Sequence, residues 1–280
     1  DEKFQEGGLR VQLSPNGGPD TFETKLEGPG NSFREGSPPL SIPMKIRVDR
    51  VARKATVSLN GDDVELTEGE LSDWVTLSFS AAPGINVSGL VRLQITEMDE
   101  HFSLYVTPIS IDPEKPAMPI SHPGYYSAYL KKKVGPYSTL GLAEDTWALN
   151  EKVIDDGTFL EMTWDIDKER EDMFFAAMDR LRTGTLACVF DATDRIQHMF
   201  FRYLDDAHPA NAGMDVERHR HAIRDLFYRA DELVGETQAR LKKGDVLFVI
   251  SDQGFKSFRR GVNLNTWLRE NGYLFLQVDP

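Results

Sequence analysis

The chain has 280 residues, of which 40% are hydrophobic and 28% are charged, and its formal net charge at pH 7 is −13. This length accommodates two domains, and the apolar fraction supports a packed core and argues against wholesale disorder. A strongly acidic surface repels phosphate backbones and anionic headgroups, so we expect neither a nucleic-acid polymer nor a membrane as partner. The single cysteine, Cys188, excludes an intrachain disulfide and a cysteine-based zinc site.

The ends of the chain and its apolar runs bear on compartment and completeness. No run of about 18 apolar residues occurs, so no membrane-spanning helix is predicted. No signal peptide is visible, and the first residue is Asp1 rather than Met. Both ends of the sequence resemble points of truncation, and we expect the chain to be a processed protein or part of a longer one. The compartment is left open, with the cytoplasm slightly favoured, and so is the oligomeric state.

The local pattern changes along the chain and predicts three parts: a flexible N-terminal segment over residues 1–20, a β-rich inserted or cap unit over 21–120, and an α/β core portion over 121–280. In the β-rich unit, short runs of Val, Ile, Thr and Leu alternate with turn residues. Asn60-Gly61 between two such runs predicts a two-residue hairpin, because this pair accepts positive φ at the least cost. The predicted strands are Met44–Val48, Ala55–Leu59, Trp74–Phe79, Leu90–Thr96 and Phe102–Ile109.

The later part of the chain alternates between helical and strand patterns. Thr185–Phe190 and Asp245–Ile250 are continuous apolar runs typical of strands buried on both faces. We therefore predict an α/β fold with a mostly parallel sheet flanked by helices. The predicted helices are Lys168–Leu181, Asp194–Leu204, Val216–Leu241 and Leu264–Glu270.

Polar residues follow both apolar runs, where ligands of open parallel sheets bind. Asp194 and His198 are four residues apart, so a helix presents them on one face, and a carboxylate and an imidazole so placed can share a divalent cation. The alternative is a helix-capping Asp beside an unrelated surface His. Asp252, at the end of the other run, strengthens the metal interpretation, and we expect the three side chains to converge.

These residues sit in motifs that resemble the alkaline phosphatase superfamily, in particular the bacterial type I phosphodiesterase/nucleotide pyrophosphatase proteins. The resemblance rests on Asp194-x-x-x-His198 within residues 189–200 and on Ser251-Asp252-Gln253-Gly254. It extends through 262–268 and, upstream, through 66–74 and 137–147.

The resemblance implies a site with two divalent metal ions, usually zinc or manganese, acting on a small phosphorylated substrate. Asp194 and His198 match the ligand pair of one metal, which a later His completes in the family. Asp252 matches the Asp of the other metal, which the family also holds through an early Asp, a Ser or Thr nucleophile and the next His. Two such ions polarise the phosphoryl oxygen, activate the nucleophile and stabilise the leaving oxygen.

The chain departs from this pattern at Gln253, which stands where the family has His. An amide oxygen is a neutral and weaker ligand than imidazole, so position 253 is a degenerate metal position. No catalytic residue is identified in this chain, and we expect the nucleophile and the later His to lie outside it. The two metal ions are therefore expected to be incomplete or absent here, and the alkaline phosphatase-like core is expected to be partial.

The resulting hypothesis is that the chain is part of a metal-dependent phosphoesterase, a phosphodiesterase/nucleotide pyrophosphatase-like hydrolase, and that the isolated chain is inactive. Two alternatives stay open: a phosphomutase of the same superfamily, which uses the same metals and a phosphorylated Ser, and a catalytically degenerate binding module. A metal titration separates an active centre, which takes up about two ions, from a degenerate one.

Overall fold

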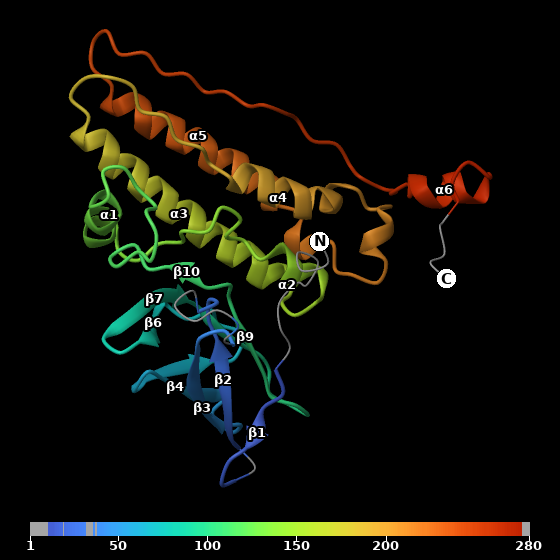
Figure 1. Ribbon diagram of the computed structural model, residues 1–280. Coiled ribbons are helices and arrows are strands. Elements are labelled where there is room, and N and C mark those ends of the chain that lie inside the picture. The colour runs from blue at the N-terminus through green and yellow to red at the C-terminus, as the bar shows by residue number, and fades with distance from the viewer. Residues whose placement is uncertain (1–10, 19, 32–35, 37, 276–280) are drawn as a thin grey trace. The chain divides into compact units, whose positions relative to one another are not determined.

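The computed structural model describes residues 11–18, 20–31, 36 and 38–275 (Figure 1). The chain forms two compact units, with the boundary between Ala192 and Thr193. Within the described residues, every helix is too short or too polar to cross a membrane.

Among its described residues, the first unit contains three antiparallel sheets. A five-stranded sheet has the order β1-β2-β3-β4-β5, a three-stranded sheet the order β10-β7-β6, and β8 pairs with β9. The strands are β1 Ser14–Pro15, β2 Thr21–Glu27, β3 Ser41–Asp49, β4 Lys54–Leu59, β5 Asp62–Thr67, β6 Val75–Ala82, β7 Ile85–Val91, β8 Leu93–Glu97, β9 Ser103–Val106 and β10 Ser110–Ile111.

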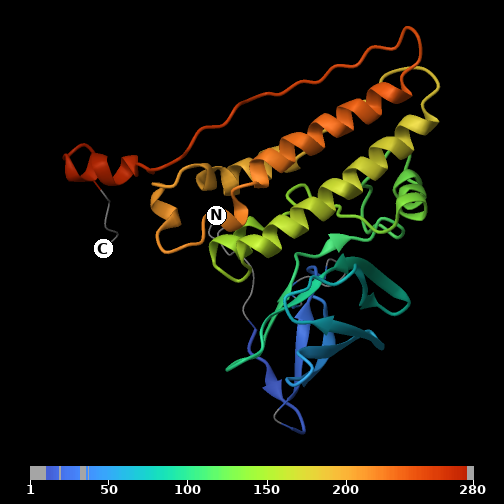
Figure 2. The same cartoon turned by 180° about the vertical axis from the view of Figure 1, so that it is seen from behind.

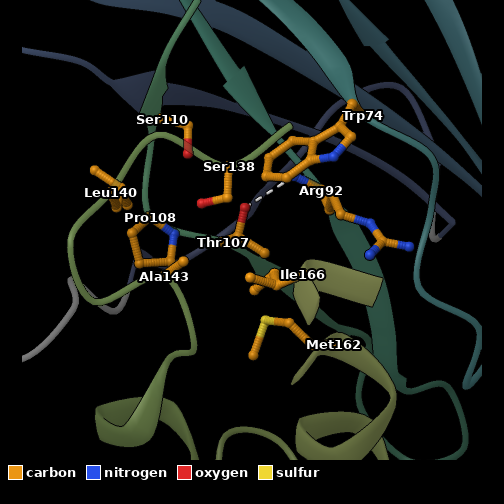
Figure 3. Close-up of a pocket in the computed structure, with 10 residues that line it drawn as sticks. All are labelled: Trp74, Arg92, Thr107, Pro108, Ser110, Ser138, Leu140, Ala143, Met162 and Ile166. Atoms are coloured by element: carbon orange, nitrogen blue, oxygen red, sulfur yellow. Dashed lines mark hydrogen bonds between the residues drawn. The ribbon is translucent and has the colours of Figure 1, made fainter. Parts of the chain in front are cut away.

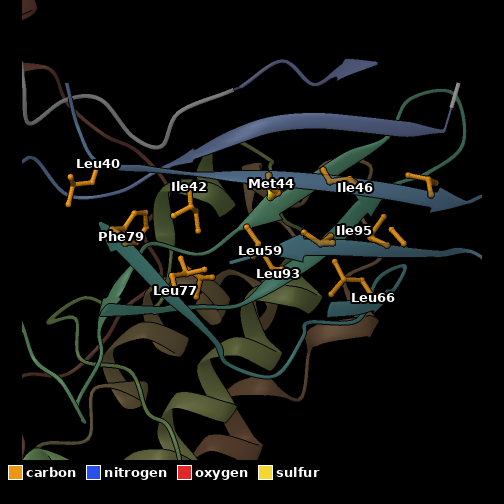
Figure 4. Packing of buried hydrophobic residues seen from close by; sticks show 14 of the residues in the cluster. Leu40, Ile42, Met44, Ile46, Leu59, Leu66, Leu77, Phe79, Leu93 and Ile95 are labelled. Carbon is orange, nitrogen blue, oxygen red and sulfur yellow. The ribbon is translucent and has the colours of Figure 1, made fainter. Parts of the chain in front are cut away.

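The sheets share one hydrophobic core. Along β3 every second residue is buried, because successive side chains of a strand point to opposite faces. The buried face of β3 meets side chains from β4, β6 and β8, as Figure 4 shows. Val57, Leu77, Phe79, Leu93 and Ile95 in this cluster are fully buried.

The Asn60-Gly61 hairpin is confirmed. Leu59 pairs with Asp62, so Asn60 and Gly61 alone form the turn. Their φ angles are both positive, at 52° and 94°. The Asn60 side chain also exchanges two hydrogen bonds with the backbone of Ser78 on β6, at 2.8 and 2.9 Å. The turn residue therefore links two sheets as well as two strands.

In the part of the first unit that the structure describes, the strands are followed by helices α1 Tyr126–Val134, α2 Thr146–Asn150 and α3 Asp156–Arg180. In both views α1 lies beside α3 (Figures 1 and 2). One face of α3 accepts hydrogen bonds from the β-rich part, because Thr158, Asp165 and Glu169 are spaced so that they lie on the same side of the helix. Gln94 Nε2 donates to Thr158 at 2.8 Å, and Arg92 Nη1 donates to Asp165 at 2.6 Å. Trp74 Nε1 donates to Glu169 at 2.6 Å.

The second unit is helical. After α4, Ala192–Phe200, come 3₁₀ helices over Phe201–Leu204, Pro209–Asn211 and Glu217–His219, then α5 Ala222–Arg240 and α6 Leu264–Glu270. Between α5 and α6 the chain runs as a long extended trace (Figure 1). The predicted helices are all present: α6 has the predicted bounds, and α3 begins twelve residues earlier than predicted.

The mixture of helices and sheets confirms an α/β protein, but the sheets that the described residues form are mostly antiparallel, in place of the predicted mostly parallel sheet. The named strands of the described residues pair in antiparallel ladders. Thr185–Phe190 and Asp245–Ile250, predicted as its strands, form no strand. A continuous apolar run predicts burial on two faces, but it does not specify which strand lies beside it. In a parallel sheet that neighbouring strand comes from a distant part of the sequence.

Candidate metal centre

Asp194 lies in the first turn of α4 and His198 in the last, one helical turn apart. Their side chains point the same way: Asp194 Oδ1 and His198 Nε2 are 3.3 Å apart. The Asp194 side chain is 32% exposed and that of His198 is 53% exposed, so solvent reaches both groups. The structure thus brings together the first two of the three predicted ligands.

Arg195 fixes the Asp194 carboxylate from the other side. Its Nη1 lies 2.6 Å from Asp194 Oδ2, and its side chain is only 19% exposed. A charge-assisted bond to one oxygen orients the carboxylate and leaves the second oxygen directed at His198. Sequence reasoning missed this residue, although its place next to Asp194 within the motif was a usable signal.

The segment 253–259 lies along α4 and the following 3₁₀ helix through every second residue. Gln253 Nε2 donates to Asp194 Oδ1 at 3.0 Å. The Phe255 ring meets the His198 ring edge-on, with centroids 4.9 Å apart at 83°, and stacks on Phe201 at 6.4 Å. Because an extended chain alternates its side chains, odd-numbered positions face the helices. Sequence reasoning also missed Phe255 as a site residue. Its position two residues after Gln253, on the same side of an extended chain, was the usable signal.

Asp205 anchors the far end of the same segment. Arg259 donates from Nε and Nη2 to Asp205 Oδ2 at 2.9 and 2.6 Å, and Ser257 Oγ lies 3.4 Å from the same oxygen. Hydrogen bonding to Arg259 lowers the pKa of Asp205. His208 Nε2 lies 2.7 Å from the carbonyl oxygen of Phe258. The segment is therefore held at both ends against one helical surface.

The spacing of Asp194 and His198 fits a bound divalent cation. Zinc ligands sit about 2.0–2.2 Å from the ion, and tetrahedral geometry then places two of them about 3.4 Å apart. The observed 3.3 Å between Oδ1 and Nε2, which is also the distance of a direct ion pair, is close to that separation. A carboxylate oxygen with an imidazole nitrogen is also a donor set that zinc and manganese accept.

Asp252 lies at an exposed bend next to Gln253. Within the described ranges, no three His, Cys, Asp or Glu side chains gather closely enough to hold a metal ion. The convergence of Asp252 with Asp194 and His198 stays a prediction. Gln253, predicted as a degenerate position, is the residue of the second motif whose side chain contacts Asp194.

A pocket in the first unit offers a weaker alternative (Figure 3). It is lined by ten residues, among them Trp74, Arg92 and Met162, and its cavity volume is about 10 Å³. This is about the volume that one water molecule needs, far below the roughly 300–1,000 Å³ of small-molecule sites. Arg92 is already engaged by the Ser72 carbonyl oxygen and Asp165, both at 2.6 Å. The pocket therefore belongs to the packing of α3 on the β-rich part.

Cys188 is half-buried and has the properties of a packing residue. Burial raises the pKa of its thiol, with the neighbouring Arg170 acting in the opposite direction. A raised pKa lowers the thiolate fraction at neutral pH, and the thiolate is the nucleophilic form. These properties do not favour a nucleophilic role for Cys188.

Comparison with known proteins identifies the family. No curated protein and no solved structure gives a significant match. The family model for type I phosphodiesterase / nucleotide pyrophosphatase matches residues 88–279, which is well over half of the chain and includes the whole Asp194, His198 and Gln253 cluster. The chain therefore belongs to the type I phosphodiesterase/nucleotide pyrophosphatase family, as the motif resemblance predicts.

Proposed function

We propose that this chain carries a divalent-cation site of a metal-dependent phosphoesterase, a hydrolase of phosphodiesters or nucleotide pyrophosphates with a small phosphorylated substrate. The carrying observation is the 3.3 Å separation of Asp194 Oδ1 and His198 Nε2 on one face of α4. Membership of the family supports the hydrolase class.

Each residue of the cluster has a definable role in this proposal. A bound cation would polarise a phosphoryl oxygen of the substrate. Asp194 supplies a fixed negative oxygen, because Arg195 holds the other one. His198 supplies a neutral nitrogen, and its ring is held edge-on by Phe255. The His198 side chain is 53% exposed, so its imidazole is accessible from solvent.

We also propose that the isolated chain hydrolyses phosphodiesters close to the uncatalysed rate. The family mechanism needs cations at both the attacking and the leaving oxygen. Gln253 supplies an amide where the family has an imidazole, which weakens the second cation. Groups that act as a unit fail together when one of them is lost. Turnover of a nitrophenyl phosphodiester well above background, with added manganese or zinc, would contradict this expectation.

A degenerate binding module is the second candidate, and one observation favours it. Gln253 Nε2 and Arg195 Nη1 both donate to the Asp194 carboxylate, so its charge is compensated by the protein's own groups. A carboxylate satisfied in this way is a stable structural element without any cation. Metal binding by this chain therefore decides between the two candidates.

Calorimetric titration with Mn²⁺ and Zn²⁺ tests the proposal on the full 280-residue chain. We expect binding by the wild type and a loss of at least about a hundredfold in affinity for Asp194→Asn and for His198→Ala, because each removes a direct ligand. Asp231→Asn and His221→Ala are matched controls at exposed positions on α5 and at its N-terminus. No binding by the wild type, or equal binding by Asp194→Asn, would show the cluster to be a structural one.

A further inference from the structure

We infer that Gln253 is the third donor to the cation held by Asp194 and His198, so that the chain builds one three-donor site. In the family pattern the residue at this position serves the other metal, with the preceding Asp. The inference rests on the proposed function, because it presupposes a cation at Asp194 and His198. It assigns Gln253 from contacts in the structure and leaves Asp252 out of the site.

The distances around Asp194 Oδ1 support this assignment. His198 Nε2 lies 3.3 Å from this oxygen, and the terminal nitrogen of Gln253 lies 3.0 Å from it. Both separations are close to the ligand-to-ligand distance of about 3.4 Å around a small divalent ion. Asp194 Oδ1 is thus the oxygen that both the His198 imidazole and the Gln253 amide contact.

The Gln253 amide can present either of its two ends at this place. Its NH₂ group donates to Asp194 in the structure, and a half-turn about the last side-chain bond exchanges the nitrogen with the carbonyl oxygen. An amide oxygen is a good ligand for hard cations, whereas the NH₂ group is not a ligand. Ion binding therefore requires rotation about one side-chain bond and no movement of the backbone.

The neighbours of Gln253 hold it in position for both arrangements. Ser251 Oγ donates to the backbone carbonyl oxygen of Gln253 at 2.7 Å, and Phe255, two residues on, packs on His198. The backbone of Gln253 is thus fixed on each side while its amide stays exposed. Rotation of an exposed amide costs little, so the hydrogen bond to Asp194 does not block the site.

The donor set also predicts which ion is preferred. One carboxylate oxygen, one amide oxygen and one imidazole nitrogen form a harder set than the His-rich sites that select zinc. We therefore expect Mn²⁺ to compete with Zn²⁺ better here than at a site with a second imidazole. The guanidinium of Arg195, bound to the other oxygen of Asp194, opposes the positive ion and keeps the affinity moderate.

Metal titration of Gln253 variants tests the inference, with the affinities for Mn²⁺ and Zn²⁺ and the stoichiometry as readouts. The wild type should bind about one ion. Gln253→Ala should weaken Mn²⁺ binding by at least about tenfold, and Gln253→His should shift the ratio of affinities toward Zn²⁺ by at least about tenfold. Gln197→Ala is the matched control, because it removes a half-buried glutamine of α4 that bonds the Thr193 carbonyl oxygen. Gln197→Ala should bind as the wild type does.

A spectroscopic readout tells whether Gln253 binds the ion directly or only positions Asp194. The visible absorption spectrum of bound Co²⁺ responds to the identity and number of its ligands. It should therefore change in Gln253→Ala and Gln253→His and stay as in the wild type in Gln197→Ala. If Gln253 only steadies Asp194, the affinity falls in Gln253→Ala while the spectrum is unchanged, and the inference is overturned.

The outcomes distinguish failure of the inference from failure of the proposed function. If the wild type binds no divalent ion, the proposed function fails first. If Asp194→Asn and His198→Ala abolish binding while Gln253→Ala leaves both affinity and spectrum unchanged, only the inference fails. Binding of two ions by the wild type would overturn it as well, because the three donors surround a single ion.

Discussion

Glu169 on α3 is a carboxylate with both oxygens engaged. Oε1 accepts a hydrogen bond from Trp74 Nε1 at 2.6 Å, and Oε2 accepts one from the backbone N–H of Ser138 at 2.8 Å. Burial raises the pKa of Glu169, although both donors act in the opposite direction. Desolvation of the charged form thus outweighs two hydrogen bonds, and the site favours a neutral side chain.

This raised pKa makes stability depend on pH with a definite sign. Folding favours the protonated form, so the contribution of Glu169 is fully present below its ordinary pKa of 4.5 and is lost as pH rises through the folded-state value. Urea unfolding of the wild type and of Glu169→Gln should show the wild type losing stability relative to the variant as pH rises from about 4 to about 8. A difference that stays constant, or that grows in favour of the wild type, would contradict the assignment.

The Asp194–His198 pair was predictable from the sequence, whereas its third neighbour was not. A four-residue spacing on a helix fixes which side chains meet, because the helical repeat is local. Whether Asp252 or Gln253 faces α4 depends on how the segment that begins at Gln253 packs along that helix, which is a tertiary contact. Two adjacent residues of an extended chain point in opposite directions, and the sequence leaves open which of them faces inward.

At the scale of elements, α2 begins in a hydrogen-bonded cap that joins it to β9. Asp145 Oδ1 accepts from the Ala148 backbone N–H at 2.9 Å, and Asp145 Oδ2 accepts from Tyr105 Oη at 2.8 Å. Tyr105 is buried, and this burial raises the pKa of its hydroxyl. One carboxylate therefore caps a helix and also satisfies a buried donor.

Asp145→Ala removes both interactions and should cost about 2–4 kcal/mol of unfolding free energy, about 1 for the cap and the rest for the unpaired hydroxyl. Tyr105→Phe is the matched control, since it loses the hydroxyl and keeps the cap, and it should cost about 1 kcal/mol. Chemical denaturation measures both. If the two variants are equally destabilised, the cap contributes nothing to stability.

The predicted elements succeeded where the pattern was local. The strands around Asn60-Gly61 and helix α6 follow directly from turn and cap residues. The long prediction over Leu90–Thr96 divides at the buried Arg92 into β7 and β8, which belong to different sheets. Thr185–Phe190 forms no strand and packs on α3 instead, where Phe190 meets Phe174 edge-on and Arg170 Nη1 bonds the Val189 carbonyl oxygen. Such choices depend on tertiary partners, which composition does not specify.

At the scale of the whole molecule, the segment Asp245–Ile250 exposes a run of large apolar side chains. Val246, Phe248, Val249 and Ile250 are 72%, 81%, 68% and 89% exposed. Backbone groups outside a ladder beside such side chains form a template for strand addition by another chain. Lys242-Lys243 precedes the run and Lys256 follows it, in a chain whose net charge is −13.

We therefore expect the chain to self-associate through this segment as concentration rises. Val249→Lys places a charge within the run and should weaken association by about tenfold, or about 1.4 kcal/mol. Val51→Lys, at a position that is 98% exposed in a turn, is the control for added charge. Sedimentation velocity over a concentration series measures both, and equal effects of the two variants would place the contact elsewhere.

The attachment of residues 253–259 at both ends also bears on the entropy of ion binding. A donor on a free loop loses conformational freedom when it meets the ion, at about 1–2 kcal/mol for each residue that becomes ordered. Here Arg259 on Asp205 and Phe255 on His198 order the segment during folding. Gln253 is therefore preorganised for the proposed ion, and a substitution of Arg259, six residues along the chain, is expected to weaken ion binding at the proposed site without touching any of the proposed ligands.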